Sequence, residues 1–359
     1  MSAVGSYVQS VLARLIEGIG IRSVVFEVAQ GCNQNCAFCY NVWKGGDYPL
    51  GRLDTAHTID LLDRILAYRP QLLTFSGGEP LLRADLTELI RHIPRRVSVN
   101  LITNGILMTD DRAIELVDAG VRMFEFTLLS ADREIHNSLV GRDSFDQLID
   151  GIASVRAAGG AVSTTFVAMR QNIDGWADTL EMNVALGVEG ILFNRYNIGG
   201  AGIAHAAELV PTVEQLKIAL AIADEGMAKY GIGISMGVPI PPCVLDRSPY
   251  KHIGFGDCPV GTKRAYPTVD PMGNVRPCNH SPTILGNLFD QPMAEIMDDE
   301  RYRSYAQAMP SACAECEHLR SCRGGCRAAA EVCGVGDGLD PFVRLCGCGE
   351  GTPCDTSIC

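Results

Sequence analysis

Six short runs of strand-forming residues alternate with helix-like runs between residues 23 and 230. Each run is almost continuously apolar, as parallel strands that are buried on both faces tend to be. The six runs are residues 23–28, 71–76, 96–103, 121–129, 161–169 and 188–194. Repeated β-α units predict a parallel sheet covered by helices. This sheet can be an open doubly wound sheet or an incomplete barrel, and periodicity does not distinguish the two.

The composition indicates a soluble enzyme-sized chain. Its 359 residues are enough for one large or two medium domains, and no apolar run reaches the roughly 18 residues that span a bilayer. The first twenty residues predict a short amphipathic helix without the features of a secretory signal, so we expect a cytoplasmic protein with no membrane partner. A net charge of −12 without a dense basic run argues against nucleic acid.

The fifteen cysteines are distributed very unevenly. Three of them, Cys32, Cys36 and Cys39, lie near the start, and we call these the N-terminal trio. None occurs in the next two hundred residues, and twelve lie between Cys243 and Cys359. In a cytosolic chain of this length, such abundance indicates metal sites more than disulfides. Two functional regions are therefore predicted.

The N-terminal trio has the spacing C-x3-C-x2-C and follows the first predicted strand. Ligands of parallel α/β folds bind beyond the carboxyl ends of the strands, so this loop lies on the ligand-binding side. Four thiolates complete a closed iron-sulfur or zinc site, whereas three leave one coordination position open for chemistry. The alternatives are a zinc knuckle completed from elsewhere in the chain, or ordinary core cysteines.

The second predicted strand ends in Ser76-Gly-Gly-Glu-Pro80, and we call residues 77–79 the Gly-Gly-Glu motif. Two glycines would let a ligand approach the backbone, and the Glu79 carboxylate can bind an ammonium group. A tight turn between strand and helix is the alternative. The motif lies one β-α unit after the N-terminal trio, in which the aromatic Phe38 precedes the third cysteine. This combination favours a binding site.

With these two motifs in successive units, the sequence resembles the radical S-adenosylmethionine (SAM) enzymes. The resemblance implies that the N-terminal trio binds a 4Fe-4S cluster and that the methionine part of SAM chelates its open iron. Gly77, Gly78 and Glu79 would then hold the methionyl ammonium. Reductive cleavage of SAM would give a 5′-deoxyadenosyl radical that abstracts a substrate hydrogen. The fold implied is a partial (β/α)6 TIM-like barrel over residues 21–235.

The resemblance also suggests further SAM contacts on the downstream strand ends. Asn104, in the segment Thr-Asn-Gly, closes the third strand, although an ordinary turn would also use these residues. Related enzymes have a serine and an acid where this chain has Thr127 and Leu129. The complete set of predicted cofactor-binding residues is Gly77, Gly78, Glu79, Phe38, Asn104, Thr127, Ser130 and Arg142. His136 is expected to be structural.

The C-terminal cysteines show a second motif. Cys258 and Cys278 flank Gly273 with the spacing C-x14-G-x4-C, and a C-x2-C-x5-C-x3-C run follows from Cys313 to Cys326. This pattern resembles the SPASM extension, which carries two auxiliary 4Fe-4S clusters in radical SAM enzymes that act mainly on peptides and proteins. Zinc ribbons also use C-x2-C pairs and remain the alternative. The resemblance implies a SPASM domain over residues 236–350 and a cysteine-containing tail over residues 351–359.

By the same resemblance, each auxiliary cluster receives its own set of cysteines. The first auxiliary set is Cys258, Cys278 and Cys326, completed upstream by Cys243. The second auxiliary set is Cys313, Cys316 and Cys322, completed by Cys346, with Cys333 and Cys348 as rivals. Cys354 and Cys359 match no pattern. His280, beside Cys278, is expected to be a polar loop residue.

The predicted function is oxidative modification of a peptide or protein by a radical SAM/SPASM maturase, for example by cross-linking. SAM and three 4Fe-4S clusters are the implied cofactors, and a flavodoxin or ferredoxin is the implied electron donor. Only about twenty residues precede the first strand, so leader recognition would require the barrel itself or a separate protein. A tetrapyrrole-modifying radical SAM enzyme is the second hypothesis. A non-catalytic iron-sulfur carrier is the third, but it leaves the Gly-Gly-Glu motif unexplained.

Overall fold

The structure is a computed structural model that describes residues 22–334 and 338–345. The predicted N-terminal helix of residues 1–20, the tail of residues 351–359, and Cys346 and Cys348 lie outside the described residues. In the part of the chain that is described, no helix has the length and apolar character needed to cross a membrane.

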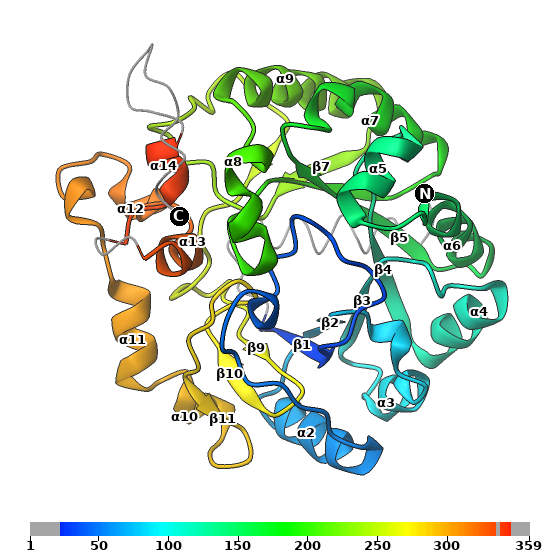
Figure 1. The fold of residues 1–359 in the computed structure, drawn as a ribbon. Helices are drawn as coiled ribbons and strands as arrows, with labels where there is room; N and C mark the ends of the chain where they lie inside the picture. The colour runs from blue at the N-terminus through cyan, green and yellow to red at the C-terminus, as the bar shows by residue number, and fades with distance from the viewer. Residues whose placement is uncertain (1–21, 335–337, 346–359) are drawn as a thin grey trace.

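All the strands form one sheet, in which β1 to β7 follow one another in chain order and run parallel. Their bounds are β1 Ser23–Ala29, β2 Leu72–Gly77, β3 Ser98–Thr103, β4 Val121–Thr127, β5 Ala161–Ala168, β6 Gly190–Arg195 and β7 Gly233–Met236. A doubly wound sheet reverses its strand order at a switch point, and this sheet does not. Figure 1 shows the strands curving into an incomplete barrel, which confirms the predicted fold class.

Helices pack around the outside of this barrel (Figure 1). They are α2 Thr55–Ala67, α3 Leu86–His92, α4 Asp110–Ala119, α6 Phe145–Ala157, α7 Trp176–Ala185 and α9 Val213–Tyr230. The short helices α5 Arg133–Val140 and α8 Ala206–Leu209 lie inward of this ring, in the segments that follow β4 and β6 (Figure 1). Alternate residues of each strand are large, apolar and fully buried in the main core, such as Phe26, Phe75 and Leu101. Because side chains alternate across a strand, the residues between them face the barrel interior.

The interior face of the barrel carries polar side chains as well as apolar ones. It carries Thr74 on β2, Asn100 on β3, Glu125 on β4 and Thr165 on β5, all of which are partly exposed. The Thr165 hydroxyl donates a hydrogen bond of 2.6 Å to Glu125. An interior lined in this way is suited to a polar ligand, unlike the apolar layers that fill a closed TIM barrel.

The C-terminal region extends the sheet of the barrel. Its strands are β8 Gly254–Phe255, β9 Thr268–Val269, β10 Asn274–Arg276 and β11 Gly286–Asn287. Strand β9 pairs in parallel with β1, with Val25 opposite Thr268 and Phe26 opposite Val269. Within the described residues, five short α-helices follow β11. They are α10 Met293–Ile296, α11 Glu300–Gln307, α12 Leu319–Cys322, α13 Arg327–Val332 and α14 Pro341–Leu345. The edge of β1 is therefore covered by a strand from the far end of the chain.

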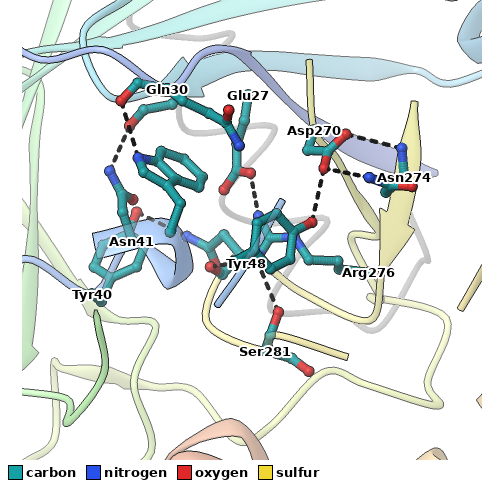
Figure 2. Close-up of polar contacts among 12 residues, drawn as sticks. Glu27, Gln30, Tyr40, Asn41, Tyr48, Asp270, Asn274, Arg276 and Ser281 are labelled. Atoms are coloured by element: carbon teal, nitrogen blue, oxygen red, sulfur yellow. Dashed lines mark hydrogen bonds and ion pairs between the residues drawn. The ribbon is translucent and has the colours of Figure 1, made fainter. Parts of the chain in front are cut away.

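Two buried ion pairs join the same two regions. Arg276 of β10 pairs with Glu27 of β1, and both side chains are almost completely buried (Figure 2). Arg195, the last residue of β6, pairs with Asp340, and both are also buried. Burial raises the pKa of Glu27 to about 7 although Arg276 lowers it. Losing one partner of such a pair typically costs about 3–5 kcal/mol, so these contacts hold the two regions in a fixed arrangement.

Candidate functional site

The N-terminal trio lies in the loop after β1, at the carboxyl end of the barrel strands. All three cysteines line a cavity of ≈ 110 Å³ together with the Gly-Gly-Glu motif. The other lining residues are Gln34, Phe38, Tyr40, Asn41, Lys44, Ser76, Ile102, Thr103, Asn104 and Thr127. Two motifs that lie forty residues apart in the sequence thus meet in one hollow, because β1 and β2 are neighbours in the sheet.

The two glycines of the Gly-Gly-Glu motif serve a purpose beyond the one expected. A Cβ on Gly77, which has φ +130°, would lie 2.1 Å from the carbonyl oxygen of Ala29. A Cβ on Gly78 would lie 2.1 Å from the carbonyl oxygen of Gly31. The Gly78 amide donates to that Ala29 oxygen at 2.7 Å. The glycines therefore allow the motif to pack on the backbone leading to the cysteines, and both of them also line the cavity, where a ligand could approach their backbone.

Glu79 is a buried carboxylate whose partners are all neutral in the described part of the chain. It accepts hydrogen bonds from the Leu81 amide at 2.9 Å, the Thr103 hydroxyl at 2.8 Å and the Asn104 amide at 2.8 Å. Burial raises the pKa of Glu79, although these three donors lower it. A buried carboxylate costs free energy unless it is paired with a cation. The geometry therefore suits a ligand that brings a positively charged group.

The thiols of the N-terminal trio fit a cationic metal cluster. Burial raises the pKa of Cys36 and of Cys39, and the neighbouring cysteines raise both further. Three thiolates could not persist side by side in this loop without a positive centre, since like charges at close range disfavour ionisation. Bound iron supplies that charge and keeps its thiol ligands deprotonated. The donor set is thus suited to an iron-sulfur cluster with one open position.

Lys44 is a cavity residue that no sequence motif indicated. It ends the short helix η1, Val42–Lys44, and its Nζ donates to the Gln34 carbonyl at 3.2 Å. The residue before that helix, Asn41, donates from Nδ2 to the Gly77 carbonyl at 3.0 Å. Lys44 lowers the pKa of Cys36 and of Cys39. The cavity therefore has a carboxylate, Glu79, and an ammonium group, Lys44, in its lining.

The predicted SAM contacts separate into two groups. Phe38, Asn104 and Thr127 line the cavity. Ser130 does not line it, and its hydroxyl accepts a hydrogen bond of 3.0 Å from the Asp132 amide. Arg142 does not line it either, and its guanidinium donates to the Asn33 carbonyl at 2.8 Å. The structure therefore brings only the first group to the cysteines.

His136 is buried in the barrel wall, as expected for a structural histidine. Its Nδ1 lies 3.4 Å from the Leu129 amide, and its ring packs edge-on against Phe145. Burial lowers the pKa of His136 to about 4. The ring is therefore neutral near pH 7 and holds the end of β4 in place.

Cys258, Cys278 and Cys326, the predicted first auxiliary set, are all buried and interact electrostatically with one another. Burial, together with Cys326 and Cys258, raises the pKa of Cys278 to about 12. The Asn197 amide donates to the Cys326 sulfur at 3.4 Å. Such hydrogen bonds tune the potential of a bound iron-sulfur cluster.

Cys243 is not grouped with these residues. It is exposed and lines a separate cavity with the second auxiliary set, Cys313, Cys316 and Cys322. The reason is that the two prolines before Cys243 direct the chain from β7 to the loops around α12. Its expected place as the fourth ligand of the first set is therefore corrected. Cys333, a rival for the second set, is disulfide-bonded.

No three Cys, His, Asp or Glu side chains within residues 22–334 and 338–345 are placed to hold a single metal ion. A tetrahedral zinc site needs four ligands around one centre at about 2.0–2.3 Å. The cysteine sets therefore do not form a compact zinc site of the kind considered from the sequence. The N-terminal trio lines a cavity of ≈ 110 Å³, and the second auxiliary set lines one of ≈ 20 Å³.

Comparison with known families identifies both halves of the chain. Residues 26–182 match the radical SAM superfamily, and residues 258–322 match SPASM, an iron-sulfur cluster-binding domain. The first match contains the N-terminal trio and the Gly-Gly-Glu motif, and the second contains five of the six cysteines of the two auxiliary sets.

Individual relatives match nearly the whole chain. A PqqA peptide cyclase of Streptomyces rochei is 28% identical over 335 residues, which are 90% of this chain and 89% of the relative. An AdoMet-dependent heme synthase of Methanosarcina barkeri is 27% identical over 346 residues, 89% of this chain and 94% of the relative. The structure of Streptococcus suis SuiB bound to its precursor peptide SuiA has a TM-score of 0.68 at 14% identity, covering 91% of this chain and 77% of SuiB.

The partial barrel carries three cysteines and a buried carboxylate at the carboxyl ends of its strands. The cysteines are suited to an iron-sulfur cluster, and the carboxylate is suited to the ammonium group of an amino-acid-like cofactor. The chain has a radical SAM domain over residues 26–182 and a C-terminal SPASM domain over residues 258–322. SAM and iron-sulfur clusters are its cofactors.

Proposed function

We propose that this enzyme uses SAM to make an oxidative modification, such as a cross-link, in a peptide or protein. The observation that carries this proposal is the shared cavity of the N-terminal trio and Glu79, which joins a three-thiolate cluster site to an ammonium-binding carboxylate. When bound there and reduced by one electron, SAM supplies a 5′-deoxyadenosyl radical. The protein's part is to hold the cofactor and the substrate together and to exclude water.

Within the cavity, we assign the two charged side chains to the two charged groups of the methionine part of SAM. Glu79, with its neutral partners, faces the ammonium group, and Lys44 faces the carboxylate. Ser130 and Arg142 were predicted as SAM contacts from the sequence, but neither lines the cavity, and we assign a SAM contact to Lys44 instead. Cys32, Cys36 and Cys39 hold the cluster, and Phe38, Asn104 and Thr127 provide the remaining walls.

Changing Lys44 to methionine should weaken SAM binding by roughly tenfold, because an exposed or half-exposed charge pair contributes about 1 kcal/mol or somewhat more. Lys44→Arg should bind SAM nearly as well as the unchanged protein. The measurement is the dissociation constant of SAM for the cluster-loaded protein, from the change that SAM causes in the cluster's EPR spectrum. Arg142→Met is the matched control and should not alter it, since Arg142 lies outside the cavity. Equal affinities for Lys44→Met and the unchanged protein would contradict the assignment.

A second hollow is large enough to take part of a large substrate. It has a volume of ≈ 410 Å³ and lies between the loop of residues 42–49, the segment after β6 and the loop of residues 282–284. Its lining is mostly apolar and includes Tyr48 and Ile284. The hollow therefore lies between barrel loops and SPASM segments, and the loop of residues 42–49 that lines it follows the N-terminal trio in the sequence. The relative named PqqA peptide cyclase and the SuiB structure with its precursor peptide favour a peptide as the occupant.

A tetrapyrrole substrate is the second candidate, and the similarity to an AdoMet-dependent heme synthase supports it. That relative matches this chain to nearly the same extent as the peptide cyclase. The two reactions leave different products, since a cross-linked peptide loses two hydrogens and an oxidatively decarboxylated side chain loses carbon dioxide as well.

The test begins with anaerobic reconstitution using iron and sulfide, followed by SAM and a strong reductant. The enzyme should release 5′-deoxyadenosine, whereas an iron-sulfur carrier would release none. Two substrates are then compared by mass spectrometry: a short cysteine- or aromatic-containing peptide encoded beside this protein, and a propionate-bearing tetrapyrrole. Loss of two hydrogens from the peptide supports the proposal, and conversion of the tetrapyrrole alone would replace it with the second candidate.

The remaining partners are part of the same proposal. A flavodoxin or ferredoxin would supply the electron, and a separate leader-binding protein could present the peptide. We also propose a cytoplasmic location, where reduced thiols and iron-sulfur clusters persist. For the auxiliary clusters, we propose two 4Fe-4S centres on the two cysteine sets. Cys243 now joins Cys346 as a candidate ligand of the second centre.

A further inference from the structure

Two aromatic rings connect the cluster loop of the barrel to the SPASM domain. Tyr40 directly follows Cys39 of the N-terminal trio, and His280 lies two residues after Cys278 of the first auxiliary set. Their rings are stacked, with centroids 4.0 Å apart and planes inclined by 30°. Residues that are 240 positions apart in the sequence thus make a direct ring contact between two cysteine sets.

Hydrogen bonds fix both rings. The Asn279 amide donates to the Tyr40 hydroxyl at 3.0 Å. The Asn197 amide lies 3.1 Å from Nδ1 of His280 and also donates to the Cys326 sulfur at 3.4 Å. Asn197 therefore joins His280 to a second cysteine of the first auxiliary set. Figure 2 shows Tyr40 in the same close-up as the Glu27–Arg276 pair, which links β10 to β1.

The two rings form a stacked pair, and each ring is held by an asparagine side chain. A stacked pair fixed in this way is a well-ordered contact.

We propose that Tyr40 and His280 form an electron relay between the first auxiliary set and the N-terminal trio. One electron passes from a reduced cluster on Cys258, Cys278 and Cys326 to an oxidised cluster on Cys32, Cys36 and Cys39. No bond is made or broken in this step, and no proton moves. The electron is the one that a substrate radical releases, together with a proton, when it closes to the oxidised product. The relay thus rests on the proposed function and specifies how the SPASM domain serves it.

The relay can be tested with electrons stored in the protein. The loaded enzyme is reduced fully, freed of reductant and mixed with excess SAM, so that each cleavage consumes one electron. Each reduced cluster stores about one electron, so a chain with several clusters can cleave SAM more than once. The unchanged protein should therefore release more than one 5′-deoxyadenosine per chain and lose its auxiliary EPR signals. Tyr40 also lines the SAM cavity, so the SAM affinity of Tyr40→Leu is measured separately. Once this variant has released its first 5′-deoxyadenosine, its auxiliary signals should persist and decay at least roughly tenfold more slowly.

Conservative variants separate the relay from a merely structural role. Tyr40→Phe and His280→Phe keep a stacked ring and should drain the auxiliary clusters at nearly the normal rate. Tyr230→Leu is the matched control, because Tyr230 is a tyrosine of α9 that bonds to Glu181, lines neither cavity and does not stack on His280. Iron content and SAM affinity are measured for every variant.

Equal decay of the auxiliary EPR signals in Tyr40→Leu and the unchanged protein would overturn the relay. Decay that is as slow in Tyr40→Phe as in Tyr40→Leu would also overturn it, since the ring would then not be the conducting element. If the unchanged protein releases one 5′-deoxyadenosine per chain and no more, the auxiliary set does not supply the trio and the relay fails while SAM cleavage stands. Release of none would overturn the proposed function together with the relay.

Discussion

Replacing Cys32, Cys36 and Cys39 together by alanine is expected to abolish the cleavage of SAM and to leave the SPASM clusters in place. The three thiols are the cysteines that line the cavity with Glu79, so their loss removes the iron that SAM must chelate. The other cysteine sets lie on separate loops and do not depend on the trio for their ligands. Iron should fall from about twelve to about eight atoms per chain, and 5′-deoxyadenosine should be undetectable.

Cys322→Ala is the matched control for this triple variant. It removes a thiol of the second auxiliary set and should lower the iron content by about four atoms while single-turnover cleavage of SAM continues. If the triple variant still releases 5′-deoxyadenosine, the reactive cluster has been assigned to the wrong cysteines.

Glu79→Gln should reduce the cleavage of SAM by roughly two orders of magnitude or more. The neutral amide cannot pair with the methionyl ammonium, and losing a buried charge-assisted hydrogen bond costs about 2–4 kcal/mol. The amide also accepts through one oxygen where the carboxylate uses both, one toward Thr103 and Leu81 and the other toward Asn104. Most of the loss should therefore appear as weaker SAM binding, measured by equilibrium dialysis with the cluster-loaded protein.

Glu125→Gln controls for the loss of a carboxylate from the barrel interior. Glu125 accepts one hydrogen bond, from Thr165, and does not line the cavity of the N-terminal trio. Its replacement should leave SAM affinity unchanged within about twofold. Normal SAM binding by Glu79→Gln, with full iron content, would show that the ammonium group is held elsewhere.

The strands and the cluster motifs were predictable because their signals are local. Each barrel strand is a short apolar run, and each of the six predicted runs contains or overlaps one of the strands β1 to β6. Closure into a partial barrel depends on strand order and curvature that periodicity does not encode, so it was predicted only through the resemblance to a known family. The short strand β7 was also missed, because its four residues, Gly233–Met236, carry too weak a pattern.

The parts of the site that escaped prediction depend on contacts between distant segments. Lys44 belongs to no motif and reaches the cavity because Asn41 attaches its helix to Gly77. Cys243 was grouped by sequence order, but the path of the chain after β7 decides its neighbours. The stacked pair of Tyr40 and His280 joins two domains and leaves no trace in either segment alone.

The pairing of β9 with β1 determines how a substrate can enter. Backbone hydrogen bonds between β1 and β9 and the Glu27–Arg276 ion pair connect the barrel rigidly to the SPASM domain. The sheet therefore sets the distance between the loop of the N-terminal trio and the loops of the first auxiliary set. A hinge that swings the SPASM domain away would have to break this pairing and expose two buried charges. Entry through the hollow of ≈ 410 Å³ that the loop of residues 42–49 lines, with movement confined to such loops, avoids that cost.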